Sequence, residues 1–500
     1  MLKAALALIA GGIMPFAFAP FEYPYLAFFS MTIFCGCLLH ARPGEAFRSG
    51  MWFGLGLFGM GISWIFNSIS LAGAGLMVSL LLTCLLIGLL AFFNALSAWL
   101  AAWLLHGQRT DTDRSVLHWI VLFPAMWVLA EWMRTRFLNG FPWLLAGYSQ
   151  TDTLLTGYAP VIGVYGLSLV MTCMAAMMVA ALFHAGALRS LFMTLMAGMV
   201  LLGVALSTRH WTQPSGAALP VALLQGNIAQ DIKWQPESQK QTLQNYVDMT
   251  REHWDARLII WPETAVPVFY HQVVNGWLNP LAEEARTHMA TIMLGIPYVD
   301  QASRAYQNAL VSIGADEGSY FKSHLVPFGE YLPFRSLLGF VLELIQFPMA
   351  DFMPGDPLRQ VPLQVAGHVV GSSICYEDVF GDEIRRPLFA GAELLVNVTN
   401  DAWFGDSWAP HQHWQIARMR AMETGRYLVR ATNTGVSGII NDRGGVEAVG
   451  GVFRREVITG MVQPMQGMTP YASHGDWPAF CLSFTILAAY LLRRIYLYRG

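Results

Sequence analysis

Apolar segments long enough to cross a membrane dominate the first 208 residues and return at the end of the chain. A spanning helix needs about 20 mostly apolar residues, because its backbone polar groups can bond only to one another in lipid. Charged residues make up 13% of the 500 residues, against a usual share of about 25%. The sequence therefore predicts a multi-span α-helical membrane domain with eight helices, over residues 3–19, 23–41, 50–70, 75–105, 116–134, 159–184, 190–208 and 477–493.

The first of these segments has a second interpretation. Lys3 precedes an apolar run that ends in Ala17-Phe18-Ala19, which is also the pattern of a secretory signal peptide. Because six further apolar segments follow at once, we expect an uncleaved first helix.

Most charged residues lie between the seventh and the eighth apolar segment. Between Arg209 and His474 lie 26 of the 33 acidic residues and 19 of the 30 basic residues. A window of this size is typical of one domain. We therefore expect membrane helices over 1–208, an aqueous domain over 209–474, and a last membrane helix with a short tail over 475–500. The net charge of −3 argues against a protein that binds nucleic acid through a basic surface.

Basic residues in the short loops predict the orientation of the helices, because cytoplasmic loops carry an excess of Lys and Arg. If the N-terminus is cytoplasmic, only Arg134 and Arg136 lie in short loops on the outer side. This pattern predicts cytoplasmic termini and an aqueous domain outside the cytoplasm. The basic residues on the cytoplasmic side are then Lys3, Arg42, Arg48, Arg109, Arg114, Arg189, Arg493, Arg494 and Arg499.

Glu131 lies close to those two arginines, at the outer end of the fifth predicted span. The three charges fit interfacial anchoring, which we favour, or a site for a lipid headgroup near the outer leaflet.

The aqueous domain alternates short β-rich runs with helical stretches, which favours an α/β fold. Several consecutive strands without a helix between them argue against a purely parallel sheet, so we expect an α-β-β-α sandwich, two face-to-face sheets with helices outside. The expected strands are 219–226, 257–261, 290–296, 307–313, 367–374, 393–399, 427–432 and 436–441. The expected helices are 237–255, 273–288, 378–389 and 411–426.

Three residues of this domain combine into one chemistry. Glu263 and Cys375 each follow an apolar run, at the strand end where α/β active sites form, and Lys322 opens the segment KSHLVPFGEYLP. A thiol can attack a carbonyl carbon, a carboxylate can accept its proton, and an ammonium can stabilise the resulting oxyanion. Taken singly, Glu263 fits a surface loop and Lys322 a solvated side chain, so only the combination predicts a site.

The cysteine distribution also singles out Cys375. The other five cysteines, Cys35, Cys37, Cys84, Cys173 and Cys481, lie in predicted spans, so Cys375 has no disulfide partner within its domain. A lone thiol in an oxidising compartment is expected to be either buried or used. From its position alone, a nucleophile and a small core residue are equally good interpretations.

The strings around these residues resemble a known family. WPE at 261–263, the run from Lys322 and SICYED at 373–378 are similar to the Glu–Lys–Cys set of the nitrilase (carbon–nitrogen hydrolase) superfamily. Together with LLQGNI at 223–228, VTNDAWFG at 398–405 and the apolar segments, the chain resembles the apolipoprotein N-acyltransferase family, the membrane-embedded branch. The resemblance covers nearly all 500 residues.

The resemblance implies a role for several residues. Glu263 would be the general base, Lys322 the stabiliser of the oxyanion, and Cys375 the acylated nucleophile. Glu330 matches the family's second glutamate, which would orient the lysine. Tyr376 and Glu377 match the family's residues beside the nucleophile, and Trp234 matches an aromatic residue at the substrate entrance.

The resemblance also implies a two-step reaction in the bacterial inner membrane. A phospholipid would give an acyl chain to the thiol, and the α-amine of a diacylglyceryl-cysteine at a lipoprotein's N-terminus would take it, as the last step of lipoprotein maturation. The catalytic domain would then be periplasmic. We expect no cofactor, no metal, no nucleic-acid partner and a monomer.

Residues 337–349 form a strongly apolar run inside the otherwise aqueous domain. They fit a core segment or a mobile lid that dips into the outer leaflet and guides acyl chains, with Phe340 and Leu344 as its substrate-binding residues.

Other functions are also consistent with parts of the sequence. A membrane-anchored amidase could use the same three residues, but it would leave the seven leading spans unexplained. A transporter with an extramembrane domain is disfavoured, because the spans carry few polar residues near their centres. His411 and His413 could contact a metal, yet no further Cys or His follows at ligand spacing.

Overall fold

The computed structural model describes residues 1–106, 112–300, 304–331, 352–358 and 360–499. The chain divides into two compact units. The first comprises Met1–Phe66, Gly75–Arg209 and Ser473–Gly500, and the second Asn67–Ala74 and His210–Ala472.

The first unit is helical throughout its described part. Long, mostly apolar helices alternate with short turns, and aromatic side chains pack between them; Phe34 and Phe53, for example, stack with ring centroids 4.1 Å apart. The α-helices are α1 (Leu2–Ile13), α2 (Tyr25–Leu38), α3 (Pro43–Gly61), α4 (Ile65–Leu71), α5 (Leu76–Leu105), α6 (Thr112–Arg134), α7 (Ala159–Phe183), α8 (Gly186–Ser207), α16 (Pro470–His474) and α17 (Trp477–Arg499), of which α4 and α16 cross the unit boundary. Short 3₁₀ helices are η1 (Met14–Ala17), η2 (Phe137–Asn139), η3 (Ala146–Gln150) and η4 (Thr156–Tyr158).

The predicted number of eight spans is wrong. Among the described residues, five helices are long and apolar enough to cross a membrane, or six if the pair α3 and α4, bent by 54°, counts as one span. The first two predicted spans correspond to apolar helices that are shorter than this limit, Leu2–Ala17 and Tyr25–Leu38. The 14 residues of α2 extend only about 21 Å against a hydrocarbon core of about 30 Å.

Glu131 and Arg134 are buried in the first unit and bind the chain that follows α6. The Glu131 Oε1 accepts hydrogen bonds from Trp127 Nε1 at 2.9 Å and from the backbone N–H of Ala146 at 2.8 Å. Arg134 Nη1 donates to the carbonyl oxygens of Phe141 and Trp143. Both side chains thus satisfy backbone groups of the chain that follows α6, while interfacial anchoring and a headgroup site stay predictions.

The second unit contains two six-stranded sheets. In one the strand order is β13-β2-β3-β4-β5-β6, and in the other it is β12-β11-β10-β9-β8-β7. Parallel pairs occupy the centres, β2 with β3 with β4 and β8 with β9 with β10, and antiparallel strands flank them. The first sheet comprises β2 (Leu219–Gln225), β3 (Leu258–Ile260), β4 (Thr291–Val299), β5 (Tyr306–Gly314), β6 (Gly318–Phe321) and β13 (Glu456–Val462). The second comprises β7 (Leu363–Val365), β8 (His368–Ile374), β9 (Leu394–Thr399), β10 (Leu428–Thr432), β11 (Gly438–Ile440) and β12 (Val446–Val449), and a separate pair joins β1 (Gln213–Pro214) to β14 (Met465–Gln466).

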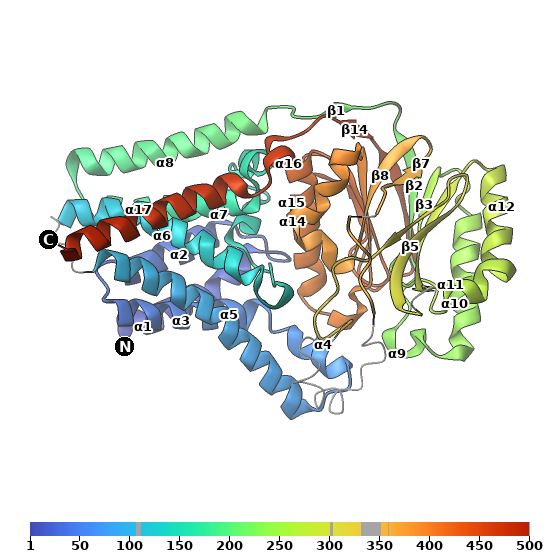
Figure 1. Ribbon diagram of the computed structural model, residues 1–500, viewed down its shortest axis with the longest axis horizontal. Helices are drawn as coiled ribbons and strands as arrows, with labels where there is room; N and C mark the ends of the chain where they lie inside the picture. The colour runs from blue at the N-terminus through green and yellow to red at the C-terminus, as the bar shows by residue number, and fades with distance from the viewer. Residues whose placement is uncertain (107–111, 301–303, 332–351, 359, 500) are drawn as a thin grey trace. The chain divides into compact units, whose positions relative to one another are not determined.

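The expected α-β-β-α sandwich is confirmed. One apolar core joins side chains of both sheets, such as Val221 and Ile260 with Val370 and Val396. Two further cores lie between the sheets and the flanking helices, and Figure 1 shows α10, α11 and α12 beside the first sheet and α14 and α15 beside the second. The helices of this unit are α9 (Gln230–Lys233), α10 (Pro236–Arg251), α11 (Tyr270–Val273), α12 (Asn279–Thr287), α14 (Gly381–Ile384) and α15 (Ala409–Thr424). Shorter turns are the π-helix η5 (Val274–Leu278) and the 3₁₀ helices η6 (Cys375–Val379), η7 (Arg386–Ala390) and η8 (Asp401–Phe404).

All eight expected strands are present, and most of their ends lie within two residues of the expected positions. The helix expected over 378–389 is instead divided among η6, α14 and η7. Pro387 at the start of η7 is one cause, because proline lacks the N–H that a continuing helix would need.

Candidate active site

Glu263 lies in the turn that follows β3. The turn is held by the buried Trp261, whose Nε1 donates to Thr250 Oγ1 at 2.9 Å. It also passes so close to Gly295 of β4 that a Cβ there would lie 2.5 Å from the Pro262 carbonyl oxygen and 2.7 Å from Glu263 Cα. Glycine at 295 therefore permits the close packing that places the Glu263 carboxylate.

The Glu263 carboxylate has donors on both oxygens. Its Oε1 accepts from Asn308 Nδ2 at 2.7 Å and from Lys322 Nζ at 3.3 Å, and its Oε2 accepts from the backbone N–H of Asn400 at 2.9 Å. The side chain is only 9% exposed. Hydrogen bonds to a charged group in such surroundings fix its orientation, so Glu263 presents a defined carboxylate to its neighbours.

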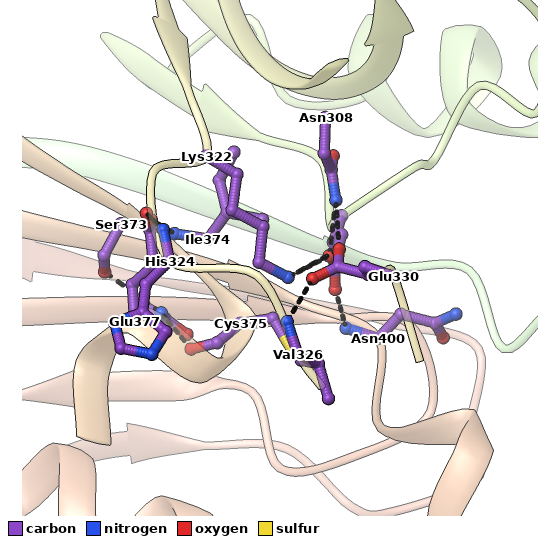
Figure 2. Close-up of polar contacts among 12 residues, drawn as sticks. Asn308, Lys322, His324, Val326, Glu330, Ser373, Ile374, Cys375, Glu377 and Asn400 are labelled. Carbon is purple, nitrogen blue, oxygen red and sulfur yellow. Dashed lines mark hydrogen bonds and ion pairs between the residues drawn. The ribbon is translucent and has the colours of Figure 1, made fainter. Parts of the chain in front are cut away.

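Lys322 follows β6 and is almost completely buried, with 1% of its side chain exposed. Its Nζ donates to Glu330 Oε1 at 2.8 Å as well as to Glu263 (Figure 2). Glu330 is itself oriented, because its Oε2 accepts from the backbone N–H of Val326 at 2.8 Å. The ammonium thus lies between two carboxylates that keep it in place.

Cys375 is the first residue of η6, directly after β8. Its backbone is in the left-handed region, with φ of 53°, which a residue with a side chain adopts at a cost of about 1–2 kcal/mol. Its thiol is close enough to Lys322 and Glu263 for both charges to act on it, and Figure 2 shows its side chain beside the lysine. The structure therefore brings Glu263, Lys322 and Cys375 together, from loops that follow three different strands.

The electrostatics of this group define its resting protonation states. Burial lowers the pKa of Lys322, but the Glu263 and Glu330 carboxylates outweigh it and hold this pKa well above its ordinary value. Burial and the Glu263 charge raise the pKa of the Cys375 thiol well above its usual range, although Lys322 acts in the opposite direction. Both shifts favour an ammonium on Lys322 and a protonated thiol on Cys375, and a protonated thiol needs a base before it can attack.

Glu377 connects the cysteine turn to the lysine loop. Its Oε1 accepts from the backbone N–H groups of Ser323 at 2.6 Å and His324 at 3.1 Å, and its Oε2 accepts from Ile374 N at 2.7 Å and Tyr320 Oη at 2.9 Å. Burial and the neighbouring charge of Glu383 raise the pKa of Glu377 to about 7, although the backbone N–H groups of Ile374 and Ser323 oppose the shift. Glu377 thus acts on the geometry of both loops.

Tyr376 lies beside the nucleophile and packs edge-on against Phe380, with ring centroids 5.3 Å apart. Trp234 is half-buried directly after α9, and its neighbour Lys233 donates to the Glu263 carbonyl oxygen at 3.3 Å. Burial lowers the pKa of Lys233 to about 8. Phe340, Leu344 and the apolar run 337–349 lie outside the described residues, so the lid stays a prediction.

Asn308 belongs to the site although the sequence did not point to it. Its backbone carbonyl accepts the N–H of Lys322 at 2.8 Å, and its Nδ2 donates to Glu263 at 2.7 Å and more weakly to Glu330 at 3.4 Å. The signal that could have identified it is an amide within the apolar strand YQNALVSIG, where a buried polar side chain needs partners.

We expect Asn308→Ala to slow attack of the Cys375 thiol on a carbonyl substrate by about 10- to 100-fold, because hydrogen bonds to charged groups contribute about 1.5–3 kcal/mol. The substitution removes a donor from Glu263 and leaves Lys322 less restrained. The rate is measured in a single turnover with the full-length protein, with thermal unfolding as the folding control. Asn275→Ala, an exposed asparagine in η5, is the matched control, and an equal rate in the two variants would contradict the assigned role.

Two family models match the chain. The apolipoprotein N-acyltransferase N-terminal domain matches residues 10–177, and the carbon–nitrogen hydrolase domain matches residues 220–468. The second match contains Glu263, Lys322 and Cys375.

Curated relatives match over almost the whole chain. A protein named apolipoprotein N-acyltransferase from Methylococcus capsulatus is 50% identical over 99% of this chain and 97% of its own length. Proteins of the same name from Nitrosomonas europaea and Pseudomonas syringae pv. tomato are 42% and 40% identical, over 94% and 95% of this chain and 93% of their own lengths. Identity of this extent covers both units.

Proposed function

The chain belongs to the apolipoprotein N-acyltransferase family, and from this premise we propose the donor, the intermediate and the residues of its reaction. The enzyme is a bacterial membrane acyltransferase that N-acylates lipoproteins. The donor is a phospholipid, the acceptor is the α-amine of a lipoprotein's diacylglyceryl-cysteine, and a thioester on Cys375 carries the acyl chain between them. The observation that carries this proposal is the buried Lys322, which is paired with two carboxylates and lies beside Cys375 (Figure 2).

In the first half-reaction, Glu263 accepts the thiol proton while the sulfur of Cys375 attacks the ester carbonyl carbon of the phospholipid. The Lys322 ammonium stabilises the oxyanion that forms. When the tetrahedral intermediate collapses, the C–O bond breaks and the glycerol oxygen takes the proton from Glu263. A lysophospholipid leaves, and the acyl chain remains on sulfur.

In the second half-reaction, the acceptor α-amine attacks the thioester carbonyl and gives a proton to Glu263. Collapse of the second intermediate breaks the C–S bond, the thiolate regains a proton, and the product is an amide. Glu263 therefore acts as base and acid in turn, which requires a fixed position such as its three donors supply.

The membrane helices support lipid substrates at both steps. Helices of sufficient length lie before and after the catalytic residues in the sequence, so the domain that carries these residues is tethered at both ends. We propose an inner-membrane location, with both termini in the cytoplasm, the catalytic domain in the periplasm, and a monomer as the working unit. The basic residues of the short loops support this orientation.

The thioester is tested by intact-mass analysis of the full-length protein in detergent after incubation with a phospholipid of defined chain length. We expect a single added acyl mass that maps to Cys375 and is released by neutral hydroxylamine, which cleaves thioesters. An acyl mass on another residue, or one that resists hydroxylamine, would contradict the mechanism.

An amidase would differ from the proposed acyltransferase in its product. A membrane-anchored amidase releases ammonia from small soluble amides and needs no phospholipid. Ammonia release without any acylated enzyme would favour that reaction over the proposed transfer.

A further inference from the structure

Four ionisable side chains form a buried cluster behind the cysteine turn. Asp378 comes from η6, Asp401 from η8, His413 from α15 and Arg430 from β10. Each side chain is at most 1% exposed. Charges buried to this degree are costly unless they compensate one another, so the balance of this charge cluster matters.

The geometry assigns a charge to His413. Its Nε2 lies 2.7 Å from Asp378 Oδ1, and its Nδ1 lies 3.2 Å from Asp401 Oδ1. An ionised carboxylate can only accept, so both ring nitrogens must carry a proton to bond on both sides. With His413 as an imidazolium, two carboxylates face two cations and the charge cluster is neutral.

The partners of His413 support this assignment. Burial and the Arg430 charge lower the pKa of His413, but the two carboxylates outweigh them and leave it above its ordinary value. On its own helix, Arg420 and Glu423 pair with each other at 2.9 Å and so add no net charge.

The charge cluster is connected to the backbone of the nucleophile. Arg430 Nη1 donates to Asp378 Oδ2 at 2.6 Å and to Asn397 Oδ1 at 2.7 Å. Asn397 Nδ2 in turn donates to the Cys375 carbonyl oxygen at 3.3 Å. Arg430 therefore acts on the first residue of the turn through Asn397 and directly on Asp378, three residues later. A left-handed backbone at Cys375 persists only where surrounding contacts hold it in this way.

The charge cluster also acts on the thiol through space. Burial and Glu263 are the larger causes that raise the pKa of Cys375, and the Asp401 charge adds to them. An uncompensated negative charge at this place would therefore oppose ionisation of the thiol still further.

We propose that His413 is a positioning residue which, as an imidazolium, neutralises the Asp378–Asp401–Arg430 group, so that the Cys375 turn is held without a net negative charge behind the thiol. The inference rests on the proposed function of Cys375 as the nucleophile. It adds two positioning residues, His413 and Arg430, which act through Asp378, Asp401 and Asn397.

The test compares three full-length variants in detergent: His413→Gln, Asp401→Asn and the double variant His413→Gln/Asp401→Asn. The measurement is the rate of iodoacetamide alkylation of Cys375 against pH, read from the mass of its peptide. We expect His413→Gln to shift this profile upward by about one pH unit, which is about a tenfold slower reaction below the pKa. The double variant, which is neutral again, should return to the profile of the parent protein.

Asp401→Asn alone should leave the profile near that of the parent, because His413 can release its proton once one carboxylate is gone. His411→Gln, two residues away on α15 and partly exposed, is the matched control and should not shift it.

Three outcomes would overturn the proposal. The first is an unshifted alkylation profile in His413→Gln, and the second is a double variant whose profile stays shifted. The third is a loss of folding in both His413→Gln and the double variant, which would mean that the shape of the imidazole matters and not its charge. If only His413→Gln fails to fold and the double variant folds, charge balance is supported. Because alkylation involves no acyl transfer, a failure of the proposed acyltransfer mechanism would leave this readout intact and is recognised separately by the intact-mass experiment.

Discussion

Cys375→Ala is expected to abolish both lipoprotein N-acylation and the acylated form of the enzyme. Alanine removes the sulfur that we propose carries the acyl chain, and it leaves the Lys322–Glu263–Glu330 contacts intact. Loss of a covalent nucleophile removes the two-step route as a whole, so activity should fall below detection rather than by a fixed factor. The measurement combines transfer to a diacylglyceryl peptide with intact-mass analysis of the enzyme.

Cys84→Ala is the matched control for this variant, because Cys84 is an exposed cysteine of α5 in the helical unit. It should retain both the activity and the adduct. Since Cys375 is only partly buried, its replacement should leave thermal unfolding close to that of the parent. Lipoprotein N-acylation that persists in Cys375→Ala would contradict the thioester mechanism.

Glu263→Gln is expected to slow formation of the thioester by about 10²- to 10⁴-fold, the usual contribution of a general base. The side chains have nearly the same shape, but glutamine cannot take the proton of a thiol whose pKa is raised by burial and by Glu263. One carboxylate remains for Lys322, at Glu330, so the ammonium should stay in place. The rate is followed in a single turnover by rapid quenching and mass analysis.

The exposed Glu237→Gln on α10 serves as its control and should react at the parent rate. In the parent protein the Asn400 N–H donates to the Glu263 carboxylate. The NH₂ group of a glutamine at 263 would face this N–H instead, so we also expect a modest loss of thermal stability. Thioester formation at the parent rate in a folded Glu263→Gln protein would assign the base to another residue.

The inner strands of the two sheets could be predicted well, because they are short apolar runs with turn residues between them. Residues such as those of β2 and β9 are buried along nearly their whole length, which leaves an unmistakable pattern. The four edge strands, β6, β7, β12 and β13, were not predicted, because most of their side chains are partly or fully exposed and leave no continuous apolar run. The membrane helices were predicted less well. Apolar character located the long helices, but it did not show that the first two end after 16 and 14 residues, because composition does not register where a helix begins and ends.

The residues around Glu263, Lys322 and Cys375 divide in the same way. Motif strings pointed to these three and to Glu330 and Glu377. Asn308 belongs to no motif. The pairing of β5 with β4 and β6 places its side chain within hydrogen-bond distance of Glu263.

By itself, the order of amino acids determined that this chain has apolar helices on either side of an α/β domain and which side chains could perform acyl transfer, since both follow from local composition and spacing. Only tertiary structure decided that a carboxylate and an ammonium 59 residues apart lie 3.3 Å from each other, and that His413 closes a neutral set of charges behind the cysteine turn. Contacts of that kind depend on how strands pair and how loops close over them, and hydrogen bonds and charges act over distances in space that spacing along the chain does not fix.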